Sequence, residues 1–77
     1  MTFEEICGKV LDIIISETNN KSISLEADLD LSSIQILKVL ASFERTFLVE
    51  IEDEYVFSGM FSSPLKIGRY IYHSLQT

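Results

Sequence analysis

The chain has little cysteine and histidine, and this shortage excludes several kinds of protein. It contains one cysteine, Cys7, and one histidine, His73. No disulfide can form within the chain, and there is no group of cysteine and histidine ligands to hold zinc. A lone thiol fits a reducing compartment, so we expect a cytoplasmic protein. No residue near His73 has a spacing that indicates a catalytic triad, and we expect this histidine at the surface.

Basic residues are also scarce, with six Lys and Arg against twelve Asp and Glu and a net charge of −6. Nucleic acids and anionic membrane surfaces bind proteins through a basic footprint, so we expect neither as a partner. Charged residues interrupt the apolar start of the chain at helical intervals: Glu4, Glu5, Lys9 and Asp12. No basic segment precedes them, so this start predicts neither a signal peptide nor a membrane span.

The 77 residues are 47% hydrophobic, and a chain of this size cannot divide its core, so we expect one domain over 1–77. Thr2 and Glu5 have the spacing of a capping box, which predicts a first helix from Phe3 to about Ser16. Short polar residues end this helix. In the long loop that follows, isolated apolar residues are expected to attach the loop to the core: Ile23, Leu25 and Leu29.

A second capping box, Ser32 with Gln35, predicts a helix from Ser33 to Phe47 or Leu48. Helical spacing divides its residues between two faces. The expected buried stripe is Ile36, Val39, Leu40, Phe43 and Phe47. The expected exposed face, a candidate docking surface, includes Ile34, Lys38, Ala41 and Arg45.

The last third of the chain predicts a short helix from Asp53 to Phe57 and a final helix that Ser63 caps and Pro64 opens. Signals for β-strands are weak. Gly8 and Gly68 fall inside helices, where each costs about 1 kcal/mol relative to alanine, and close contact between helices would explain both. Cys7 lies in the first helix, where we expect a partly buried, unreactive thiol.

Taken in order, these features resemble the acyl carrier protein family. The similarity runs without gaps from Asp28 to at least Ile51 and includes Asp28-Leu29-Asp30-Leu31-Ser32-Ser33-Ile34-Gln35-Ile36-Leu37, Phe43-Glu44-Arg45-Thr46-Phe47 and Glu50-Ile51-Glu52-Asp53-Glu54. The resemblance implies an all-α, acyl-carrier-like four-helix bundle with one short helix and a long loop between helices 1 and 2. It also implies that 4′-phosphopantetheine is attached covalently to Ser33.

A protein of this family carries acyl groups as thioesters on that arm and is itself no enzyme. The implied partners are a phosphopantetheinyl transferase and acyl-loading and synthase enzymes, and the implied state is a monomer. The residues expected to dock these partners are Ser32, Ile34, Leu37, Lys38, Ala41 and Arg45.

The chain departs from the family pattern in two ways. It has Ser32-Ser33-Ile34 where the family typically has Asp-Ser-Leu, and Asp30 stands where a glycine would fall. Lys38 and Arg45 occupy positions that are commonly glutamate in carriers of fatty-acid synthesis. We therefore expect a specialised carrier, serving a dedicated fatty-acid, polyketide or nonribosomal-peptide pathway.

Two other readings are open to the sequence. A small acidic helical adaptor could use the face centred on Ile34, Lys38 and Ala41 to bind a protein partner without a prosthetic group. Calcium binding is the weaker alternative: Asp28-x-Asp30-x-Ser32 begins like an EF-hand loop. However, Ser33 replaces the glycine of the sixth position and Val39 replaces the bidentate glutamate of the twelfth, so we expect no metal site.

Overall fold

The computed structural model describes residues 1–52, 54 and 62–76, and these residues form helices and no strands. The helices are α1 (Phe3–Thr18), α2 (Ser33–Phe47) and α4 (Pro64–Leu75). The prediction of an all-helical chain is confirmed for this part of the molecule. The short helix predicted for Asp53 to Phe57 lies outside the described residues, apart from Glu54.

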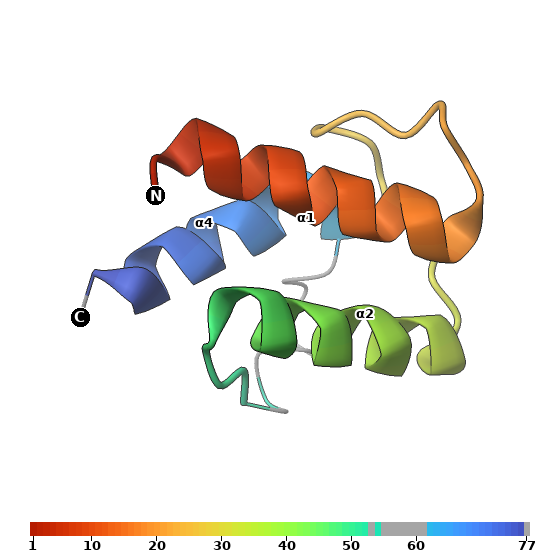
Figure 1. The fold of residues 1–77 in the computed structure, drawn as a ribbon. Helices are drawn as coiled ribbons and strands as arrows, with labels where there is room; N and C mark the ends of the chain where they lie inside the picture. Colours follow the sequence, from red (N-terminus) through yellow and green to blue (C-terminus); the bar gives the residue numbers. More distant parts are fainter. Residues whose placement is uncertain (53, 55–61, 77) are drawn as a thin grey trace.

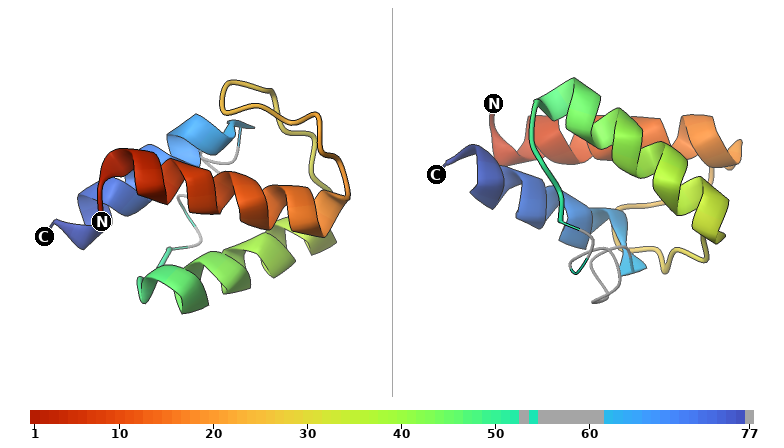
Figure 2. Two further views of the ribbon diagram at one scale, coloured as in Figure 1. Left: turned by 45° about the horizontal axis from the view of Figure 1, so that its top comes forward. Right: turned by 90° about the horizontal axis from the view of Figure 1, so that it is seen from below.

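Helix α1 packs against both α2 and α4, and it runs in the opposite direction to each of them (Figures 1 and 2). All three helices contribute to one apolar core, whose fully or nearly buried members are Ile6, Val10, Ile14, Val39, Leu40, Phe43, Phe47, Ile51, Ile67 and Ile71. The predicted stripe of α2 is confirmed, with Ile36 only half-buried at its edge. No helix in the described ranges has both the length and the apolar character needed to cross a bilayer.

Helix α1 begins with the predicted capping box. The Thr2 hydroxyl accepts a hydrogen bond from the Glu5 backbone N–H, and the Glu5 carboxylate accepts one from the Thr2 backbone N–H, each at 3.1 Å. The backbone bond holds the pKa of Glu5 below its ordinary value. The helix ends at Thr18, two residues beyond the predicted Ser16, because the Thr18 hydroxyl donates to the Ile14 carbonyl and Asn19 adopts the left-handed conformation.

The two helical glycines differ in their surroundings. A Cβ added to Gly68 of α4 would lie 2.6 Å from the Sγ of Cys7 in α1, so the prediction of a close helix contact is confirmed there. The same prediction for Gly8 is wrong, since a Cβ there would meet nothing within 4 Å. Gly8 lies on the exposed side of α1, whereas Cys7 is only 3% exposed. The thiol is thus more deeply buried than predicted.

The loop between α1 and α2 covers residues 19–32 and is held at several points. Its odd-numbered residues from 23 to 31 are half-buried and the residues between them are exposed. Ile23 and Leu29 pack against the core as predicted, and Leu31 joins them. Leu25, the third predicted anchor, is half-buried, and its carbonyl accepts a hydrogen bond of 2.9 Å from the Leu65 backbone N–H. Leu29 donates to the Ser62 carbonyl at 2.8 Å, so the loop is tied to the start of α4.

Candidate functional site

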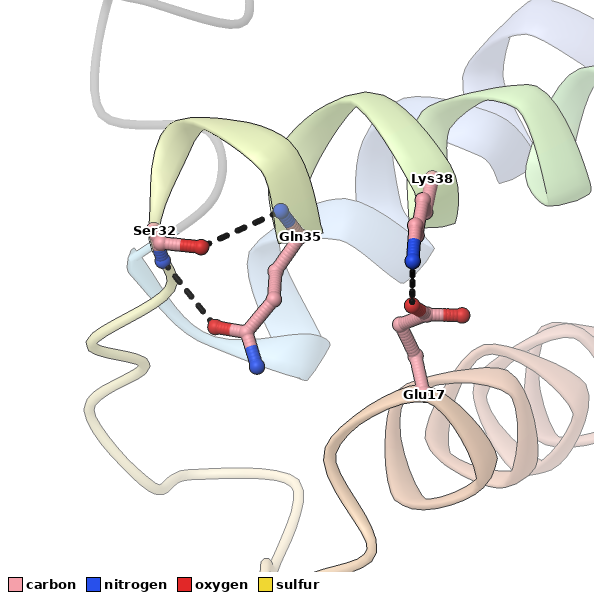
Figure 3. Close-up of polar contacts among 4 residues, drawn as sticks. All are labelled: Glu17, Ser32, Gln35 and Lys38. Atoms are coloured by element: carbon pink, nitrogen blue, oxygen red, sulfur yellow. Dashed lines mark hydrogen bonds and ion pairs between the residues drawn. The ribbon is translucent and has the colours of Figure 1, made fainter.

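The start of α2 is fixed by Ser32 and Gln35, which form the second predicted capping box (Figure 3). The Ser32 hydroxyl accepts a hydrogen bond of 3.2 Å from the Gln35 backbone N–H. In return, the Gln35 side-chain oxygen accepts one of 3.0 Å from the Ser32 backbone N–H. The Ser32 carbonyl also accepts the first helical bond, from the Ile36 N–H at 2.9 Å. Ser32 is therefore a structural residue whose hydroxyl is engaged in capping the helix.

Ser33 follows as the first residue of α2, and it is exposed. Because Ser32 supplies the cap, the Ser33 hydroxyl is not needed to start the helix. The first turn of α2 contains no acidic residue. A negative group on Ser33 would therefore meet free backbone N–H groups and the positive end of the helix dipole, without a carboxylate from the same turn. The geometry suits an attachment point for an anionic group.

A pocket with a volume of about 270 Å³ lies between the end of α1, the loop and the first turn of α2. Its lining residues are Thr18, Asn20, Ile23, Asp28, Leu29, Asp30, Leu31 and Gln35. Gln35 belongs to both the pocket and the capping box, which places the pocket next to the start of α2. The lining combines apolar loop residues with carboxylates and amides, so it offers both packing and hydrogen bonds to a small group.

All the predicted docking residues lie on α2 or at its N-cap, and all are exposed. They are Ser32, Ile34, Leu37, Lys38, Ala41 and Arg45. Two of them are large apolar side chains that a core would normally bury, Ile34 at 67% exposed and Leu37 at 63%. The i, i+3 and i+4 spacing from residue 34 to residue 45 places them along one side of the helix.

The charges on α2 are arranged unevenly. Lys38 reaches toward α1 and its Nζ lies 3.8 Å from a carboxylate oxygen of Glu17 (Figure 3). Its side chain is nonetheless 63% exposed, and a surface pair of this kind contributes only about 0–1 kcal/mol. Glu44, the one acidic residue of α2, accepts a hydrogen bond of 3.1 Å from the Ile51 backbone N–H and is half-buried. The exposed face of the helix is therefore apolar and basic.

The structure adds an exposed apolar residue at the C-terminal end of α2, Leu48, which the sequence did not single out. Leu48 caps the C-terminus of α2 with φ 56° and ψ 45°, and it is 88% exposed. This left-handed conformation is disfavoured for a leucine and is usually occupied by glycine. The available signal was a large apolar residue at the position where a helix commonly ends in glycine.

The remaining titratable groups form no second site among the described residues. No cluster of three or more His, Cys, Asp or Glu side chains that could hold a metal ion occurs there. His73 is exposed as predicted, with its ring centroid 6.0 Å from that of Tyr72. Burial raises the pKa of the Cys7 thiol, which the charge of Arg69 partly opposes. A buried thiol that resists ionisation is a poor nucleophile.

Comparison with known proteins gives no family: no protein-family model, no curated protein and no solved structure matches the chain.

Proposed function

We propose that the chain is an acyl carrier protein that tethers acyl intermediates as thioesters on a 4′-phosphopantetheine arm attached to Ser33. The observation that carries the proposal is that two neighbouring serines at the start of α2 differ in what their hydroxyls do. Ser32 caps the helix through its hydroxyl, while Ser33 presents a primary alcohol to solvent at the first helical position. A separate transferase can reach such a hydroxyl.

The first turn of α2, which contains no acidic residue, fits the product of that reaction. The phosphodiester would carry a negative charge next to the free N–H groups of the first turn, an interaction worth about 0.3–1 kcal/mol at an exposed site. The terminal thiol of the arm supplies the thioester chemistry when the arm is present. The chain's own residues orient the attachment point and perform no bond-making step, so the protein is a substrate for its partner enzymes.

The loop from 19 to 32 gives the attachment point a defined position. Backbone hydrogen bonds from Leu29 to Ser62 and from Leu65 to Leu25 tie it to the segment that leads into α4. A loop of this length inside a small domain is typically functional. The adjoining pocket offers space for part of the arm or of its cargo. The helical arrangement around one core is compatible with the four-helix carrier bundle that we propose. We also propose that the protein is monomeric and cytoplasmic and that it serves a specialised pathway.

The test is the mass of the intact protein after incubation with coenzyme A and a broad-specificity phosphopantetheinyl transferase. The proposal expects a mass increase of one phosphopantetheine in the parent chain and none in Ser33→Ala. Ser22→Ala is the matched control, because it removes an exposed serine hydroxyl from the loop, outside the capping box and outside the predicted docking residues. It should still be modified. No increase with several active transferases, on a protein shown to be folded by circular dichroism, would contradict the proposal.

The second candidate is the helical adaptor, and the exposure of Ile34 and Leu37 favours it. An adaptor would bind a protein partner through this face of α2 with no group on Ser33. Ser33→Ala separates the two functions: it abolishes loading of a carrier, whereas an adaptor keeps its binding. Ile34→Asp would instead remove partner binding in an adaptor while leaving the first helical hydroxyl in place.

A further inference from the structure

The solvent-facing side of α2 combines exposed apolar side chains with positive charge. Five large apolar residues are exposed in the described part of the chain, and three of them belong to α2 or to its C-cap: Ile34, Leu37 and Leu48. Surface apolar residues scattered singly need no explanation, but Ile34 and Leu37 are neighbours on one helix face, and adjoining exposed apolar side chains indicate an interaction site. Leu48 keeps its 88% exposure in a left-handed conformation that costs a leucine energy. We call Ile34, Leu37, Lys38, Ala41, Arg45 and Leu48 the α2 face.

The sign of the charge on the α2 face is opposite to that of the chain. Helix α2 contains two of the six basic residues, Lys38 and Arg45, and one of the twelve acidic residues, Glu44. Glu44 is half-buried and accepts the hydrogen bond from Ile51, so it does not neutralise the face. Arg45 is exposed and forms no ion pair with any described residue, the only such pair there being Lys38 with Glu17. Among the described residues, Arg45 is thus unpaired, whereas Lys38 shares its charge with Glu17 but keeps 63% of its side chain exposed.

We propose that the α2 face binds a partner protein through an apolar groove bordered by carboxylates. The apolar side chains would enter the groove, and Lys38 and Arg45 would meet the carboxylates at its edge. Complementary charge of this kind sets the choice of partner and the association rate more than the final affinity. A phosphate-rich partner fits less well, because two cations in a chain of net charge −6 do not make a basic footprint.

This inference deepens the proposed function by stating the chemistry of the surface on which the carrier, or the adaptor, docks. It depends on that function only for the partner's role, since the binding itself needs no group on Ser33. Failure of Ser33 loading and failure of charge-selective binding are therefore separate results of separate experiments.

The experiment uses two synthetic amphipathic helical peptides with the same leucine stripe, one flanked by glutamates and the other by lysines. Each is titrated into the full ¹⁵N-labelled chain and followed by NMR. The glutamate peptide should shift the amides of residues 34–48 and bind at least about tenfold more tightly than the lysine peptide. Its affinity should fall as salt is raised, because screening acts within about 10 Å at 0.1 M salt.

A double variant, Lys38→Glu with Arg45→Glu, should reverse the preference between the peptides. The matched control is Lys21→Glu with Lys66→Glu, which changes the net charge equally at two exposed positions outside α2. It should keep the preference for the glutamate peptide. Equal affinity for both peptides, no binding of either at millimolar concentration, or shifts centred outside residues 34–48 would overturn the proposal. The proposal would also be overturned if the same amides shifted with protein concentration in the absence of peptide, because the α2 face would then bind a second copy of the chain.

Discussion

Gly68 of α4 lies directly against the side chain of Cys7 in α1, so that a Cβ on Gly68 would come 2.6 Å from the Cys7 Sγ. That distance is too short for two non-bonded atoms, and both residues are buried. Helices α1 and α4 approach closely here because one of them has no side chain at the contact. The pair therefore sets the spacing of the two helices.

We predict that Gly68→Ala destabilises the fold. Overpacking of a filled core typically costs about 1–3 kcal/mol, which outweighs the roughly 1 kcal/mol that alanine gains over glycine in a helix. Gly8→Ala is the matched control, since nothing lies within 4 Å of its added Cβ. It should stabilise the fold by up to about 1 kcal/mol. The measurement is the free energy of unfolding in urea.

The double variant Cys7→Ala with Gly68→Ala tests the cause. Removing Sγ leaves the Cys7 Cα and Cβ at 3.7 and 3.8 Å from the added methyl group, which are ordinary contacts. The loss from Gly68→Ala should therefore be smaller in the Cys7→Ala background than in the parent. An undiminished loss would mean that another part of the interface rejects the methyl group.

A second prediction concerns the two left-handed residues that end α1 and α2. Leu48 and Asn19 both have φ 56°. The conformation costs an L-residue about 1–2 kcal/mol, and glycine avoids this at an entropic cost of about 0.5–1 kcal/mol. Leu48→Gly should therefore raise the free energy of unfolding by roughly 0.5–1 kcal/mol, because an 88% exposed side chain contributes little packing.

Asn19→Gly is the control for this gain. Asparagine tolerates the left-handed conformation through its short polar side chain, so the change should be only a few tenths of a kcal/mol. Equal gains at both positions in urea unfolding would show that glycine acts through something other than relief of the leucine's strain. If the α2 face binds the glutamate peptide, Leu48→Gly should also weaken that binding while it stabilises the chain.

The neighbouring serines give a third prediction. Ser32→Ala removes the acceptor for the Gln35 N–H and should cost about 0.5–2 kcal/mol of stability. Ser33→Ala changes an exposed side chain outside the capping box and should stay within about 0.5 kcal/mol of the parent. Thermal or urea unfolding of the two variants measures both. Similar losses of stability in the two variants would mean that Ser33 shares the capping role. The two serines would then not differ in function as proposed.

The helix starts could be predicted from the sequence because they depend on residues three positions apart. Thr2 with Glu5 and Ser32 with Gln35 form the expected capping boxes, and Ser63 caps α4 before Pro64. Such capping hydrogen bonds depend only on residues within a single helical turn. The exposed side of α2 was predictable for a similar reason, since the apolar period alone identifies the buried stripe.

Contacts between helices were less predictable. Gly8 and Gly68 look alike in sequence, yet only Gly68 touches another helix, because the approach of α4 to Cys7 depends on how both helices pack. Helix α1 also ends two residues later than predicted, because Thr18 bonds to the Ile14 carbonyl and Asn19 caps the helix, and a count of apolar residues does not register these local contacts. Modification of Ser33 depends on recognition by another protein, and its exposure and the Ser32 cap are only the conditions for it.

The last prediction follows from the carboxylates after α2. A hydrogen bond to Glu54, together with the charges of Glu54 and Glu50, raises the pKa of Glu52 above its ordinary value of 4.5. The folded state thus binds this proton more tightly than the unfolded state does. The resulting stabilisation is fully present below about pH 4.5 and is lost as the pH rises through the folded pKa.

We therefore predict that Glu52→Gln stabilises the chain at pH 7 and that the advantage over the parent shrinks as the pH falls to about 4, where an ordinary glutamate becomes protonated. Glu26→Gln, at an exposed position of the loop, is the control. It removes one negative charge as well, and so measures how much any such loss reduces charge repulsion in a chain of net charge −6. Unfolding in urea across this pH range supplies the comparison.

NMR titration of the Glu52 carboxyl carbon gives the direct check. In Glu54→Ala, the pKa of Glu52 should return toward its ordinary value, because both the hydrogen bond and the nearest like charge are gone. An unchanged pKa would assign the shift to another neighbour.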